Sequence, residues 1–131
     1  MRFTHALSSN PVCSPTRATF LTGLIPSQHG LHSFLDPKFM MGPEAYNTLR
    51  EFTSLGEVLR DSGYVCGLSG KWHLGDQPAF LPTKQGFDHY LGIPYSNDML
   101  KTASVDGRRV VPLVRDEKVE RLLDEADQDS I

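Results

Sequence analysis

A helix-forming stretch followed closely by a short apolar stretch limits this chain to folds that pack helices against a sheet. Thr53-Ser54-Leu55-Gly56-Glu57 has the pattern of a helix start, and Gly63 is a natural stop. The apolar positions that fall on one face of this helix are Leu55, Val58 and Leu59. Tyr64-Val65-Cys66-Gly67-Leu68 then predicts a short buried strand. A helix followed by a strand in this way indicates an α/β fold.

Length and composition fit one globular domain. The chain has 131 residues, of which 39% are hydrophobic and 22% charged, enough to bury a core. A formal net charge of −3 argues against a nucleic-acid partner, because proteins that bind nucleic acids present a basic face. Two cysteines are too few for a disulfide scaffold. No apolar run approaches the roughly 18–20 residues of a membrane span, so no membrane-spanning segment is expected.

The other segments carry weaker signals. Residues 2–8 suit a strand, and Ser14–Thr22 suits a short helix with Gly23 as its stop and with Ala18, Phe20 and Leu21 available to the core. Residues 24–48 have no sustained period and are interpreted as a long, partly ordered loop. Residues 108–114 suggest a strand, placed at a sheet edge because of Pro112. The acidic stretch 116–129 is expected to be solvated.

Cys13 stands between Pro11 and Pro15 at the start of the expected helix. An isolated cysteine is most often a small core residue. Here, however, unpaired N–H groups and the helix dipole would favour an anionic group, and Arg17 lies one turn further along the same face. The segment is interpreted as a nucleophile placed to receive an oxyanion. Zinc is disfavoured, because no second Cys or His lies at ligand spacing nearby.

Lys71 and His73 flank Trp72 in a segment bracketed by Gly70 and Gly75, directly after the predicted strand. Open α/β sheets place their ligands at the edge where such strands end. If the segment is extended, Lys71 and His73 point to the same side, where a cation and a histidine could neutralise an oxyanion and exchange a proton. Taken alone, the loop is more typical of an exposed lysine, a satisfied histidine and a packed tryptophan than of a reactive site.

Together these segments resemble the sulfatase family. Residues 13–23, CSPTRATFLTG, look like the signature Cys-x-Pro-x-Arg-x-x-x-Leu-Thr-Gly, and residues 70–75, GKWHLG, resemble the second family signature. Residues 85–88, QGFD, and 92–96, GIPYS, are also similar to arylsulfatases. The resemblance spans about residues 1–115. It implies an α/β, alkaline-phosphatase-like sandwich with a mixed, mostly parallel sheet flanked by helices, truncated at both ends.

The resemblance also implies a set of roles. A maturation enzyme would oxidise Cys13 to formylglycine, whose hydrate is the nucleophile, with calcium bound beside it and residue 13 as one metal ligand. Arg17 would hold the hydrate, Lys71 would bind a sulfate oxygen, and His73 would contact the hydrate and help to eliminate sulfate. Ser96 matches a substrate-contacting position. The implied partners are a sulfated small molecule or glycan and the formylglycine-generating enzyme, and the implied location is exported: periplasmic, secreted or lysosomal.

The metal site is where the sequence departs from the family pattern. The family places an Asp-Asp pair before the cysteine motif and an Asp-Asn pair downstream, whereas Asn97 and Asp98 stand in the reverse order. Residues 1–131 are therefore expected to be an N-terminal portion of a sulfatase catalytic domain, with 116–131 as a linker-like tail, and to be inactive by themselves. Two alternatives stay open: a phosphonate or phosphate diester hydrolase of the same superfamily, and a non-catalytic truncated domain.

The remaining candidate residues favour ordinary structural roles. Cys66 lies in the apolar strand and is expected to be a core thiol. His29 and His32 could line the site from the long loop, but loop histidines are more often exposed. The sequence identifies no partner for His89.

Overall fold

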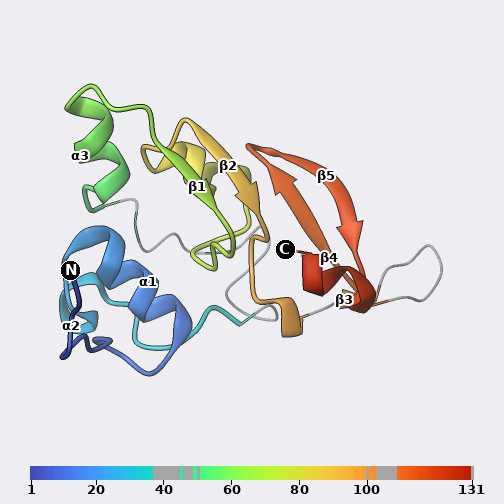
Figure 1. Cartoon of the computed structure of the whole chain (residues 1–131), viewed down its shortest axis with the longest axis horizontal. Coiled ribbons are helices and arrows are strands. Elements are labelled where there is room, and N and C mark those ends of the chain that lie inside the picture. Colours follow the sequence, from blue (N-terminus) through green and yellow to red (C-terminus); the bar gives the residue numbers. More distant parts are fainter. Residues whose placement is uncertain (37–44, 46–48, 50, 100, 103–108, 131) are drawn as a thin grey trace.

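A computed structural model gives the structure of residues 1–36, 45, 49, 51–99, 101, 102 and 109–130. The α-helices lie in the first half of the chain and the described strands in the second half (Figure 1). The helices are α1 (Cys13–Thr22), α2 (Pro26–His29) and α3 (Leu55–Asp61). The strands are β1 (Gly67–Ser69), β2 (His89–Gly92), β3 (Lys101–Thr102), β4 (Arg109–Arg115) and β5 (Lys118–Leu123). Short 3-10 turns are Pro78–Phe80, Pro82–Lys84, Asn97–Met99 and Glu125–Ser130.

The strands form one mixed sheet in the order β1-β2-β4-β3, with β5 also paired to β4. The expected α/β class with a mixed sheet and flanking helices is confirmed. The parallel share is smaller than expected, because only β1 and β2 run parallel among the described strands. The pairs β2–β4, β3–β4 and β4–β5 are antiparallel. For β4 and β5 the reason is local, because Asp116 adopts a left-handed backbone with φ of 54° and the two strands join there as a hairpin.

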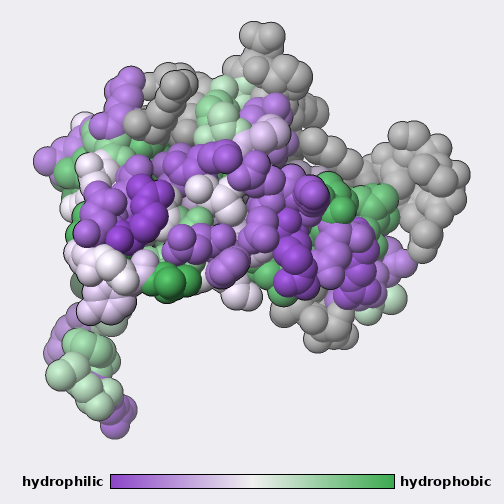
Figure 2. Space-filling model, turned by 90° about the horizontal axis from the view of Figure 1, so that it is seen from above, coloured by the Kyte–Doolittle hydropathy of each residue, from purple (hydrophilic) through white to green (hydrophobic). Residues whose placement is uncertain are grey.

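The same hairpin corrects two predictions about the end of the chain. β4 is not an edge strand, since it pairs with β2 as well as β5. Pro112 is tolerated because β2 pairs only with Val114 and Arg115, beyond the proline. The stretch expected as a linker-like tail contains β5, although most of β5 is solvent-exposed, as the acidic composition indicated. Figure 2 shows a face of the molecule on which hydrophilic residues predominate.

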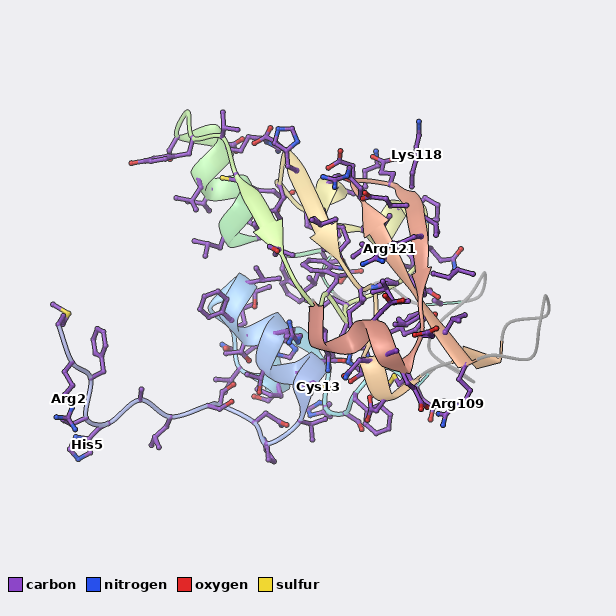
Figure 3. The ribbon with its side chains drawn as sticks, turned by 45° about the vertical axis from the view of Figure 1, so that its right-hand side comes forward. Arg2, His5, Cys13, Arg109, Lys118 and Arg121 are labelled. Carbon is purple, nitrogen blue, oxygen red and sulfur yellow. The ribbon has the colours of Figure 1, made fainter. Side chains whose placement is uncertain are left out.

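The prediction of a strand over residues 2–8 is wrong. These residues form neither helix nor strand, and their apolar side chains are open to solvent, Phe3 at 76% and Leu7 at 94%. Figure 3 shows this segment, which carries Arg2 and His5, extending away from the body of the molecule. A strand needs a neighbour to pair with, and in the described part of the chain no strand pairs with this segment.

The two longer helices begin and end where their sequences indicate. α1 ends at Gly23, whose left-handed backbone with φ of 71° suits glycine. α3 begins with a capping box, in which Ser54 Oγ accepts from the Glu57 N–H and the Glu57 carboxylate accepts from the Ser54 N–H. The long loop over 24–48 contains α2, and much of its second half lies outside the described residues.

Burial of the helix faces differs from the expectation. Ala18 and Leu21 of α1 are buried as predicted, whereas Phe20 is 75% exposed. The apolar residues of α3 are also partly open, as are Tyr64 and Val65 before β1, which is shorter than predicted. Little of the described chain covers this side of β1, which is the edge strand of the sheet.

The core lies between α1 and the sheet. Trp72 and Tyr90 are its largest fully buried side chains, and Leu31, Leu35, Leu74 and Val111 pack around them. The Trp72 indole N–H donates to the Phe80 carbonyl, so the buried ring is also satisfied as a donor. The segment that follows β1 is therefore fixed in the core, which positions the residues on either side of Trp72.

Candidate active site

The backbone before α1 fixes Cys13 at the start of the helix. The Asn10 side chain accepts from the Val12 N–H at 2.9 Å, and the Asn10 carbonyl accepts from the Thr16 hydroxyl at 2.6 Å. Val12 is extended and α1 begins at the next residue. Cys13 is half-buried at the N-terminal end of α1, near the middle of the molecule (Figure 3). The helix-start position predicted for Cys13 is confirmed.

His73 meets Cys13 across 60 residues of sequence. Its Nδ1 lies 3.2 Å from the Cys13 Sγ, and its Nε2 lies 3.0 Å from the Leu35 carbonyl oxygen. A carbonyl can only accept, so in the neutral ring Nε2 carries the hydrogen. Nδ1 is then the unprotonated nitrogen and accepts from the Cys13 thiol. The histidine is oriented as a base toward whatever group stands at position 13.

The backbone at His73 is unusual and the side chain is fully buried. Its φ is 57°, in the left-handed region, and its N–H donates to the Pro94 carbonyl at 3.0 Å. The segment is therefore not extended through His73, contrary to the expectation from the sequence. Burial lowers the pKa of His73 below its ordinary value, and nearby Lys71 and Arg17 lower it further, against the Leu35 carbonyl and Asp98. The imidazole is thus neutral at pH 7.

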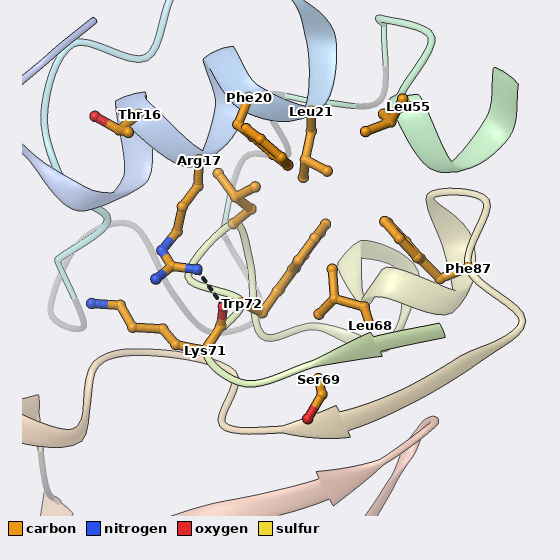
Figure 4. Close-up of a pocket in the computed structure, with 11 residues that line it drawn as sticks. Thr16, Arg17, Phe20, Leu21, Leu55, Leu68, Ser69, Lys71, Trp72 and Phe87 are labelled. Carbon is orange, nitrogen blue, oxygen red and sulfur yellow. Dashed lines mark hydrogen bonds between the residues drawn. The ribbon is translucent and has the colours of Figure 1, made fainter. Parts of the chain in front are cut away.

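Two cations and a hydroxyl complete the cluster. The Arg17 guanidinium donates to the Lys71 carbonyl, as the dashed line in Figure 4 shows. The Lys71 Nζ donates to the Ser96 Oγ at 3.0 Å. A hydrogen bond from Ser96 is the main cause that lowers the pKa of Asp98, and the charge of Lys71 adds to it, so the Asp98 carboxylate remains ionised. The cations Arg17 and Lys71 give the cluster the charge that an oxyanion requires.

All five residues singled out for the site thus come together: Cys13, Arg17, Lys71, His73 and Ser96. Sequence reasoning missed three of their neighbours. Asp98 was set aside because it does not fit the family's metal pattern, whereas the structure places it against Ser96. Ser14 and the carbonyl of Leu35 were missed because only the packing of the loop after α2 brings them to the site, and no sequence signal reports that packing.

The other candidates lie outside this cluster. Cys66 is buried, as predicted. His32 is exposed, as expected of a loop histidine. His29 is not: it is 3% exposed, accepts from the Leu31 N–H at Nδ1 and faces the Thr19 hydroxyl with Nε2. His89 is exposed and lies 3.9 Å from the Asp116 carboxylate.

A largely apolar pocket of about 360 Å³ lies beside the cluster, between α1, α3 and β1 (Figure 4). Arg17 and Lys71 stand at one end, and Leu55, Leu68 and Phe87 at the other. Cys13, His73 and Ser96 are not among its lining residues. The reactive groups are therefore next to this pocket and not inside it.

Within the described residues, no three His, Cys, Asp or Glu side chains gather closely enough to hold a metal ion. Cys13 by itself does not make a site for calcium, which takes six to eight oxygen ligands. The described side chains therefore do not form a metal site by themselves. Among the same residues, no helix is long and apolar enough to cross a bilayer.

The chain matches known proteins over most of its length. The family model described as "Sulfatase" matches residues 1–129. Human arylsulfatase G is 43% identical over 99 residues, a match that covers 76% of this chain and 18% of the relative. Bovine arylsulfatase A is 46% identical over 101 residues, covering 75% and 19%. N-acetylgalactosamine-6-sulfatase of the dog is 38% identical over 103 residues, covering 72% and 19%.

Solved structures agree with these matches. The PsFucS1 sulfatase from Pseudoalteromonas superposes with a TM-score of 0.57 and 29% identity, covering 70% of this chain and 18% of that one. Ps i-CgsB has the same fold, with a TM-score of 0.60 and 24% identity over 92% of this chain and 29% of its own. The chain spans about a fifth of the length of the curated relatives it matches. Since the family model covers nearly every residue, the chain belongs to the sulfatase family.

Proposed function

We propose that the protein carrying this chain hydrolyses sulfate monoesters to an alcohol and inorganic sulfate, with residue 13 as the nucleophile. The observation that carries the proposal is the contact between Cys13 and His73, because a reactive group and an oriented base meet there at 3.2 Å. Arg17 and Lys71 supply positive charge beside that contact. Membership of the sulfatase family supports the same reaction.

The proposed nucleophile is formylglycine made from Cys13, which in hydrated form offers a hydroxyl to sulfur and a second hydroxyl for the release of sulfate. The site fits this group, since an oxygen near the Sγ position would face the unprotonated Nδ1 of His73. His73 would take the hydroxyl proton at Nδ1. Lys71 would bind a sulfate oxygen together with Ser96, whose hydroxyl lies 3.0 Å from Nζ. Arg17 would orient the hydrate from the same helix.

Several finer points belong to the same proposal. The metal would be calcium, with the formylglycine made from Cys13 as one ligand. Its other oxygen ligands would have to come from residues other than those described, because these hold no cluster of three ligand side chains. For that reason we expect residues 1–131 to be inactive by themselves. A formylglycine-generating enzyme would act on the segment around Cys13, and export to a periplasmic, secreted or lysosomal location would follow the family. The substrate would be a sulfated small molecule or glycan, and no nucleic acid is expected as a partner.

The test uses the full-length protein produced with the maturation enzyme. Peptide mass spectrometry over residues 10–23 is expected to find formylglycine at position 13, and the protein is expected to hydrolyse an aryl sulfate. Lys71→Ala and His73→Ala should each lower turnover by about 10²-fold or more, because each removes an oxyanion or proton-transfer group. Lys84→Ala and His89→Ala are matched controls on exposed residues and should stay near the unmutated rate.

Three outcomes would contradict parts of this proposal. An active enzyme with only unmodified cysteine at position 13 would exclude formylglycine. Near-normal turnover in both Lys71→Ala and His73→Ala would exclude the assigned site. Faster hydrolysis of a phosphonate or phosphate diester than of any sulfate ester would assign the other chemistry of the superfamily.

A further inference from the structure

Ser14 is fully buried next to Cys13, and its hydroxyl has no role in the reaction described above. Its side chain has no exposed surface, and its Oγ accepts from the Leu35 N–H at 3.1 Å. Leu35 is 1% exposed and lies in a stretch without helix or strand. The Ser14 hydroxyl therefore attaches an irregular segment to the first turn of α1.

That attachment closes a ring of contacts around the proposed base. The Leu35 N–H is held by Ser14 at 3.1 Å, and the Leu35 carbonyl accepts from Nε2 of His73 at 3.0 Å. The other nitrogen of His73 faces the Cys13 Sγ at 3.2 Å. Cys13 is bonded to Ser14, so the ring returns to its starting point through the backbone. One residue, Leu35, thus connects the serine to the histidine through its N–H and its carbonyl.

We propose that Ser14 is a positioning residue for His73. By binding the Leu35 N–H, Ser14 keeps the Leu35 carbonyl at Nε2 of His73 and thereby selects the tautomer in which an unprotonated Nδ1 faces residue 13. The role of Nδ1 as a base rests on the proposed function, whereas the ring of contacts does not depend on that function. A histidine in the other tautomer would present a hydrogen to residue 13 and could not take a proton from it. A wrong tautomer is among the most damaging faults in a histidine base.

Removing the Ser14 oxygen has a definite consequence. In Ser14→Ala the Leu35 N–H would be buried without an acceptor, which costs about 1–3 kcal/mol unless the segment moves. If the segment moves toward another acceptor, the Leu35 carbonyl leaves Nε2 and the tautomer is no longer fixed. Ser14→Thr keeps an oxygen at the same place and should preserve the tautomer. Ser54→Ala is the matched control, because Ser54 is an equally buried serine, at the start of α3, without a contact to His73.

The first measurement is the ¹⁵N NMR spectrum of histidine-labelled full-length protein at pH 7.5, prepared without maturation so that residue 13 remains cysteine. In the unmutated protein, Nε2 of His73 is expected to carry the hydrogen. Ser14→Ala should shift the ring nitrogens toward a mixture of tautomers, while Ser14→Thr and Ser54→Ala should keep the original spectrum. A hydrogen on Nδ1 in the unmutated protein would overturn the proposal even if Ser14→Ala fails to fold, and so would an unchanged spectrum in Ser14→Ala.

The second measurement is steady-state turnover of an aryl sulfate by the matured protein. Because Ser14 lies inside the segment read during maturation, rates are expressed per mole of formylglycine determined by mass spectrometry. Ser14→Ala should lower kcat by about 10²-fold with little change in KM, since the substrate contacts are intact. Normal kcat in Ser14→Ala overturns the proposal. If no sulfate ester is hydrolysed by any form, the proposed function fails, while the NMR result still decides the role of Ser14.

Discussion

Gly92 in β2 is predicted to accept no side chain at all, because it faces the backbone of the segment that carries Lys71 and His73. A Cβ at Gly92 would lie 1.8 Å from the Gly70 carbonyl oxygen and 2.6 Å from its carbonyl carbon. Ordinary van der Waals contact begins at 3.4 Å, so β2 and the segment at Gly70 would have to separate by about 1.6 Å. Neither neighbour is a side chain that could rotate away.

The size of the effect follows from the hydrogen bonds that such a separation would break. The Gly70 N–H donates to the Leu91 carbonyl at 2.9 Å, and the Trp72 N–H donates to the Ile93 carbonyl at 2.9 Å. The His73 N–H donates to the Pro94 carbonyl at 3.0 Å. Each such bond contributes about 1 kcal/mol net, and overpacking adds about 1–3 kcal/mol. Gly92→Ala is therefore expected to lower the free energy of unfolding by about 4–6 kcal/mol.

The assay is urea unfolding of the full-length protein, compared with Gly67→Ala. Gly67 lies in β1 of the same sheet, but a Cβ there would meet nothing within 4 Å, and its φ is not in the left-handed region. Gly67→Ala should remain within about 1 kcal/mol of the unmutated protein. If Gly92→Ala destabilises the protein by less than about 1 kcal/mol, or no more than Gly67→Ala, the close backbone approach inferred here is wrong.

Two further predictions concern buried polar side chains. Burial lowers the pKa of His29 below the ordinary 6.5, with His32 adding to the shift, so the stabilisation it gives above pH 6.5 is lost as the pH falls toward the folded-state pKa. Between pH 7.5 and 5 the free energy of unfolding should fall by up to about 1.4 kcal/mol per pH unit because of this group, and the fall should be less steep in His29→Gln than in the exposed control His5→Gln. Equal slopes would refute the assignment. Ser54→Ala should lower stability by about 1–2 kcal/mol in the same urea assay, because the Ser54 hydroxyl caps α3 and also donates to the Gln85 carbonyl at 2.6 Å. Unchanged stability would contradict that capping role.

The parts of this structure that the sequence predicts well depend on local chemistry. Gly23 ends α1 because glycine accepts the left-handed backbone there, and the capping box at Ser54 begins α3 because its two hydrogen bonds span only three residues. The resemblance of the two motifs to the sulfatase signatures likewise implied that Arg17, Lys71 and His73 would act together. These signals lie within short stretches, so one sequence is sufficient to interpret them.

The parts that were wrong or missed depend on packing between distant segments. Residues 2–8 have an acceptable strand pattern, but a pattern cannot supply a pairing partner. Phe20 looks like a core residue, and its exposure depends on what covers one side of α1. The contact of Leu35 with Ser14 and His73 joins residues separated by 21 and 38 positions, and nothing in an irregular segment predicts which backbone groups it will present.

The left-handed backbone at His73 means that stability and reactivity make opposite demands on one position. A non-glycine residue at φ of 57° costs about 1–2 kcal/mol relative to glycine, which adopts this region freely. The backbone alone would therefore favour glycine, and only the imidazole, which reaches Cys13 and the Leu35 carbonyl, accounts for a histidine. Selection of this chain for thermostability alone would therefore favour replacement of His73 by glycine, and the imidazole beside residue 13 would be lost.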